Sequence, residues 1–164
     1  MKRILCSLGL VACILLTSCS NPGGGLPTVT TTDRDQAVLA MSAANTSAFN
    51  IASSGNPSDT AVTYTGTYFS LSATFSPDLQ TFVGGSGSAT ITETISGYHD
   101  PGSGYTISGT LVCTINNGTN VMTMSGNFSL SGGNVRTMSV NVTFNFKTMA
   151  YSGSATLNGQ TFIY

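Results

Sequence analysis

Apolar and polar residues alternate along most of the chain after Ala61, in several runs that end at residues favouring turns. Apolar side chains at every second position predict β-strands that each bury one face. The turns are short, as at Asp100-Pro101-Gly102 and Asn158-Gly159, whereas parallel strands would need long crossover connections. We therefore expect a mainly β fold, an antiparallel up-and-down meander of six to seven strands, as a curved sheet or barrel-like. The predicted strands lie around Phe69–Phe75, Ala89–Ile95, Tyr105–Ile115, Met122–Leu130, Met138–Phe146, Tyr151–Leu157 and Gln160–Tyr164.

Residues 33–54 are the only helical candidate in the chain. Asp33 can cap the start, apolar residues follow at helical spacing from Val38 onward, and Gly55-Asn56-Pro57 ends the run. Alanine dominates the apolar side, so this helix gains little in isolation and needs a surface to lie on. We expect one N-terminal helix packed on the sheet, and a single helix-plus-β-meander domain over residues 33–164.

Glycine recurs inside the predicted strands on their apolar parity, at Gly109, Gly126 and Gly153. Glycine weakens a strand interior, so its repeated occurrence there needs a physical explanation. The glycines could bend the sheet sharply, or leave a trough in which the alanine-rich helix packs. A third explanation is a trough that admits an apolar ligand. On that explanation the three glycines are candidate ligand-binding residues.

The N-terminus has the layout of a secretory signal peptide over residues 1–18. Lys2 and Arg3 precede the apolar stretch Ile4–Leu16, which is too short for a stable membrane span. The segment Leu16-Thr17-Ser18-Cys19 resembles the lipobox of bacterial lipoproteins. The resemblance implies that the chain is cut before Cys19, that the Cys19 thiol carries a diacylglycerol, and that the new N-terminus is acylated.

A lipoprotein signal implies a bacterial envelope protein held to a membrane by its acyl chains. Ser20 stands where an aspartate would retain an enterobacterial lipoprotein in the inner membrane, so the outer membrane is the expected location, on a side left open. Residues 19–32 are rich in glycine, proline and threonine, and we expect them to form a lipidated N-terminus and flexible tether.

Charge disfavours some partners. Of the 5 basic residues, Lys2 and Arg3 leave with the signal peptide, so 3 remain against 6 acidic residues, a formal charge of −3. Scattered cations of this number cannot neutralise a nucleic-acid backbone or hold an anionic membrane surface. We therefore expect no nucleic-acid partner.

Cys6 and Cys13 leave with the signal peptide, so the mature chain has one histidine, His99, one glutamate, Glu93, and, besides Cys19, one thiol, Cys113, for catalytic chemistry. His99 precedes a turn, where a solvated loop histidine is the ordinary role, and Cys113 shares the apolar parity of a strand, which predicts a buried, inert thiol. No nucleophile elbow or phosphate-binding or dinucleotide motif occurs, and one histidine with one thiol cannot form a usual zinc site. We predict a non-enzymatic protein without cofactor or metal.

Glu93 is the candidate that alternation singles out, because it shares parity with Ile91 and Ile95. A buried carboxylate needs a partner, and Arg136 or Lys147 is the nearest kind available. The alternative is that these charged residues sit at strand ends and reach water. We retain Glu93 as a candidate ligand-binding residue.

The sequence therefore leads to a lipid-anchored structural, adhesive or interaction module whose Ser, Thr and Asn surface contacts envelope polysaccharide or protein. One alternative is a carrier of a small apolar ligand in the trough of the meander. The other is an outer-membrane β-barrel, because apolar-out and apolar-in strands look alike in sequence.

Overall fold

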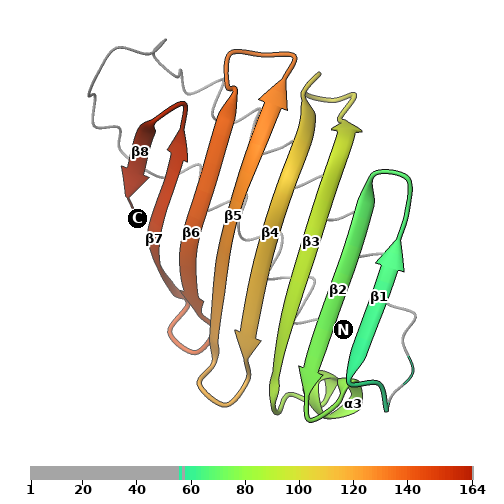
Figure 1. Cartoon of the computed structure of the whole chain (residues 1–164). Helices are drawn as coiled ribbons and strands as arrows, with labels where there is room; N and C mark the ends of the chain where they lie inside the picture. The colour runs from blue at the N-terminus through green and yellow to red at the C-terminus, as the bar shows by residue number, and fades with distance from the viewer. Residues whose placement is uncertain (1–55, 57, 164) are drawn as a thin grey trace.

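The computed structural model describes residue 56 and residues 58–163, which form one antiparallel sheet of eight strands in chain order (Figure 1). Among these residues, the edge strands β1 and β8 each pair with a single neighbour, so the eight-stranded sheet is open. The strands are β1 (Ala61–Thr65), β2 (Phe69–Ser76), β3 (Ser88–His99), β4 (Thr106–Asn116), β5 (Val121–Ser131), β6 (Thr137–Asn145), β7 (Ala150–Leu157) and β8 (Gln160–Ile163).

A short helix, α3 (Leu79–Val83), connects β2 to β3. Asp78 caps its start, since its carboxylate accepts a hydrogen bond from the Thr81 main-chain N–H at 2.7 Å. That hydrogen bond holds the pKa of Asp78 below its ordinary value. The buried Phe82 ring packs against Phe75, with the ring centroids 5.6 Å apart. Within the described residues, no helix has the length and apolar character needed to cross a membrane.

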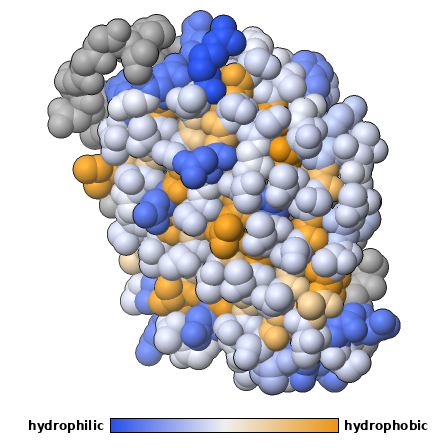
Figure 2. Space-filling view, in the orientation of Figure 1, coloured by the Kyte–Doolittle hydropathy of each residue, from blue (hydrophilic) through white to orange (hydrophobic). Residues whose placement is uncertain are grey.

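The sheet has two chemically different faces, because successive side chains of a strand point to opposite sides. We call the face that carries the buried residues the apolar face; in β4 and β5 it includes Ile107, Leu111, Cys113, Ile115, Met122, Met124, Phe128 and Leu130. We call the opposite side the polar face, where serine, threonine and asparagine dominate. Residues of intermediate hydropathy cover most of the surface seen in Figure 2, with scattered apolar side chains among them.

The predicted antiparallel meander is confirmed, but the predicted six to seven strands are wrong, because the described residues alone form eight. The additional strand is β1, which Gly66–Tyr68 joins to β2. Thr67 and Tyr68 are residue types that favour strands, so the alternating pattern did not reveal this hairpin.

The barrel-like form is not observed, because the sheet is open. The helix predicted over residues 33–54 lies outside the described residues, as do the predicted signal peptide and tether.

Candidate functional site

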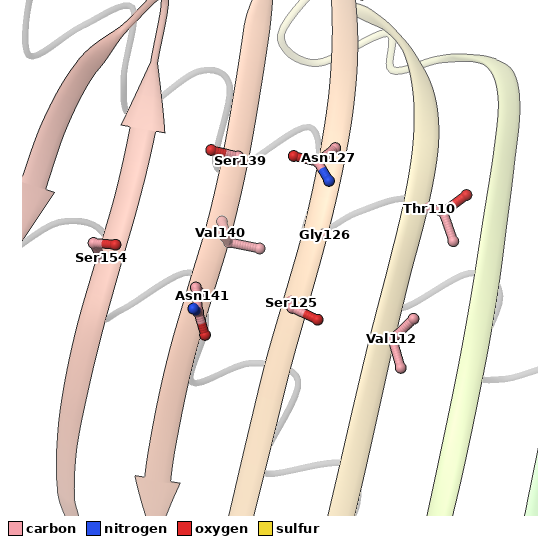
Figure 3. Close-up of a pocket in the computed structure, with 9 residues that line it drawn as sticks. All are labelled: Thr110, Val112, Ser125, Gly126, Asn127, Ser139, Val140, Asn141 and Ser154. Atoms are coloured by element: carbon pink, nitrogen blue, oxygen red, sulfur yellow. The ribbon is translucent and has the colours of Figure 1, made fainter.

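A groove of about 390 Å³ crosses the polar face over the middle of β4, β5, β6 and β7 (Figure 3). Its walls are formed by hydroxyl and amide side chains with one valine, and its floor by Gly126 and the buried Val140. The residues of the walls are Thr110, Val112, Ser125, Asn127, Ser139, Asn141 and Ser154.

Strand register arranges these side chains in two rows that run across the strands. In the first row, Thr110 of β4 pairs with Asn127 of β5, which pairs with Ser139 of β6. The second row follows the same path from Val112 to Ser125, Asn141 and Ser154. The rows lie two residues apart along each strand, a distance of about 7 Å. Residues from four strands therefore form the two sides of one groove.

Glycine shapes the sheet beneath this groove. A Cβ atom added to Gly126 would lie 2.8 Å from the main-chain oxygen of Thr110 and 3.0 Å from a ring carbon of Phe128. A Cβ atom added to Gly109 would meet the main chain of Asn127 and Phe128 in the same way. The backbones of β4 and β5 thus occupy the space that larger residues would fill, which favours the bending explanation for these glycines.

Gly153 on β7 has φ +135°, a conformation that strongly favours glycine, and an added Cβ atom would meet the main-chain oxygen of Asn141. It stands beside Val142 of β6 in the register. Gly109, Gly126 and Gly153 therefore have a packing reason, while their ligand-binding role stays a prediction.

The groove is chemically neutral, since serine, threonine, asparagine and valine form its walls. Within the described part of the chain, no side-chain hydrogen bond occupies the hydroxyl or amide groups of these walls. Each amide offers two donors and an acceptor, and each hydroxyl offers both functions. The walls hold no base that could activate a nucleophile. The arrangement is suited to binding an uncharged polar molecule.

The second feature is Glu93, which lies in the middle of β3 on the apolar face with 4% of its surface exposed. The register places it between Leu71 of β2 and Leu111 of β4. Its Oε1 atom has no hydrogen-bond partner in the part of the chain that the structure describes. Burial raises the pKa of Glu93 to about 8, so the carboxyl holds its proton at neutral pH.

The predicted partners of Glu93 do not reach it. Arg136 and Lys147 are both exposed, and burial is the cause of the raised pKa, with no lowering by a cation. The interpretation that Glu93 sits at a strand end in water is also wrong, because it is buried in mid-strand. Alternation had indicated the correct face, but the pairing of distant residues depends on the register.

The other residues that the sequence offered for chemistry do not form a catalytic or metal site in the described residues. The predicted burial of Cys113 is confirmed, and burial, with the Glu93 charge as a smaller cause, raises the pKa of its thiol to about 12. His99 is exposed at the end of β3, with its Nδ1 3.2 Å from the Thr106 hydroxyl. The described residues contain no group of three or more His, Cys, Asp or Glu that could hold a metal ion. Cys19 lies outside the described residues.

Sequence reasoning did not find the groove as a site, although it noted a polar surface. The available signal was the run of small polar residues at outward positions in four consecutive strands. Comparisons with protein-family models, with curated proteins and with solved structures found no match.

Proposed function

We propose that this protein is a non-enzymatic, lipid-anchored interaction module of the bacterial envelope that makes its contacts through the polar face. The single observation that carries the proposal is the neutral groove over β4–β7, whose hydroxyl and amide groups are free of side-chain hydrogen bonds to other described residues. A surface of this kind forms many individually weak hydrogen bonds, which suits reversible contact with an envelope component.

The anchor in this proposal is Cys19, acylated after removal of residues 1–18. The outer membrane is the proposed location, because Ser20 follows the lipidated cysteine. Residues 19–32 hold the sheet away from the lipid. We also propose that the segment 33–54, which the sequence predicts to be helical, covers the apolar face, because a single sheet with one apolar side needs a cover and the alanine-rich side of the segment suits it.

The anchor is tested by metabolic labelling with a palmitate analogue, in cells that express the wild type or Cys19→Ala. We expect label on the wild type alone, and membrane attachment lost in Cys19→Ala. Equal labelling of both proteins, or release of the wild type as an unmodified protein, would contradict the lipid anchor.

The contact surface is tested with the mature Cys19→Ala chain, which carries no acyl groups, mixed with isolated envelope fragments. We expect the fragments to retain this protein. Ser125→Glu, which places a charge and extra bulk in the groove, should lower retention, while Thr90→Glu on β3 of the same polar face should not. Retention that is absent, or equal for both variants, would contradict the proposal.

A second candidate function, transport of a small apolar ligand, is favoured by one observation. Glu93 places a protonated, partly unpaired carboxyl among leucine side chains of the apolar face, where it could bind the polar end of such a ligand. Saturable uptake of a fluorescent fatty acid, weakened by Glu93→Gln, would support this function. Uptake that never saturates would argue against it.

A further inference from the structure

We propose that the groove over β4–β7 binds an uncharged, extended polysaccharide whose chain lies across the strands. This inference rests on the proposed function, and it names the class of envelope component that the polar face contacts.

The geometry of the groove is repetitive in the direction of the proposed chain. Neighbouring strands lie about 4.8 Å apart, so each row presents one side chain per strand at that interval. The units of an extended glycan also repeat at a regular interval along the chain, so successive units would meet a hydroxyl or amide side chain on successive strands. In Figure 3, Asn127 and Ser139 of one row lie on one side of Gly126 and Val140, and Ser125 and Asn141 of the other row lie on the opposite side.

The chemistry of the two rows suits sugar hydroxyl groups, which both donate and accept hydrogen bonds. Asn127 and Asn141 stand on adjacent strands in opposite rows, so an amide is available on each side of the groove. Serine hydroxyls flank both amides. Val112 at the end of the second row supplies an apolar contact for the C–H face of a sugar ring.

The same chemistry argues against other classes of partner. An anionic polymer would require cations, and the groove walls contain none. A protein partner would be expected to use aromatic or arginine anchors in a larger contact area, and these are also lacking in the walls. A neutral glycan needs only hydrogen bonds and a small apolar contact.

The size of the groove predicts a weak single site. At about 390 Å³, it accommodates a short stretch of a polymer and leaves one side open to solvent. Many lipid-anchored copies on one membrane would bind a long polysaccharide jointly, and the combined affinity would greatly exceed that of one site. A rigid sheet favours binding, because its side-chain positions are set before the ligand binds and less conformational entropy is lost.

The experiment is native electrophoresis of the mature Cys19→Ala chain in gels that contain a soluble polysaccharide. The neutral probes are a soluble β-glucan and dextran, and the anionic probe is alginate. We expect at least one neutral probe to retard the protein and alginate to leave it unaffected. The Asn127→Ala/Asn141→Ala double variant should weaken the retardation by about tenfold or more, because two hydrogen-bonding groups are removed.

Ser125→Glu provides the sharper comparison, since it blocks the groove without touching the core. Its matched control is Thr90→Glu, an equal charge at an exposed position of the same face outside the groove. Ser125→Glu should abolish retardation, while Thr90→Glu should retain it; circular dichroism spectra establish that both variants fold.

Retardation by neither neutral probe, equal retardation by alginate, or no effect of Ser125→Glu would overturn the polysaccharide assignment. The proposed function is tested separately, by the retention of the protein on isolated envelope fragments. If those fragments retain the protein through Ser125 while the gels show no retardation, the polysaccharide assignment fails and the interaction module stands. If the fragments do not retain it either, both fail.

Discussion

The buried carboxyl of Glu93 is expected to make the stability of the fold fall as the pH rises. In the folded chain its pKa is about 8, because burial among apolar neighbours disfavours the charged form, whereas its ordinary value is 4.5. Above pH 4.5 the unfolded chain releases this proton and the folded chain keeps it. Ionisation therefore favours unfolding, and the stability that is fully present below pH 4.5 is lost progressively up to about pH 8.

The magnitude follows from the difference between the two pKa values. Each pH unit in this window lowers the free energy of unfolding by about 1.4 kcal/mol, so the loss at neutral pH is about 3 kcal/mol. Above pH 8 the folded carboxyl also ionises, and the loss levels off at about 5 kcal/mol. This is a large fraction of the stability of an ordinary domain, about 5–15 kcal/mol.

Urea denaturation followed by far-ultraviolet circular dichroism measures the effect, because the chain has no tryptophan to serve as a fluorescent probe. The mature Cys19→Ala chain is compared with the same chain carrying Glu93→Gln at pH 5, 6, 7 and 8. We expect the chain with Glu93 to have the lower free energy of unfolding at high pH. Its difference from the Glu93→Gln chain should grow by about 3 kcal/mol over this range.

Two further variants separate this effect from other causes. Glu93→Leu removes the carboxyl as well, and should flatten the pH dependence even if the buried amide of glutamine is itself unfavourable. Asp59→Asn removes one negative charge from a turn, where the carboxylate accepts a hydrogen bond from the Asn56 N–H, and serves as the control for net charge. Parallel pH curves for wild type, Glu93→Gln and Glu93→Leu would show that the reasoning is wrong.

Three further predictions concern the sheet. Gly153→Ala should lower the melting temperature and cost more than about 1 kcal/mol, because its φ of +135° and the nearby Asn141 main chain both oppose a Cβ atom; no change on thermal denaturation would contradict this. Met124→Ala should cost about 2–5 kcal/mol in urea denaturation, since Met124 is 1% exposed, whereas Met149→Ala, at 65% exposed, is the control with little effect. Cys113 should react with a maleimide only after unfolding in urea, and rapid labelling of the native protein would contradict its burial.

Much of the sheet follows from local pattern. The alternation of residues such as Ile107, Leu111 and Cys113 predicts both the strands and the side that each residue faces, since neighbouring side chains in a strand must point in opposite directions. The same rule assigned Glu93 to the apolar side. Turn residues such as Asn158-Gly159 marked where most strands end.

Local pattern could not supply the features that depend on neighbouring strands. The hairpin at Gly66–Tyr68 has one glycine, but Thr67 and Tyr68 favour strands and mask the turn, and α3 is too short to show a helical period. Parity indicated the face of Glu93, but its pairing with Arg136 was wrong, because the distance between β3 and the start of β6 depends on the order and register of the strands between them.

The groove depends both on alternation within each strand and on the pairing between strands. Each of Thr110, Asn127 and Ser139 is assigned to the polar face by the alternation of its own strand. That they form one row depends on hydrogen bonding between strands, because a shift of one residue in register would turn the facing side chains to the other side. Alternation within each strand thus determines which residues face solvent, and hydrogen bonding between strands brings the side chains of four strands together into one groove.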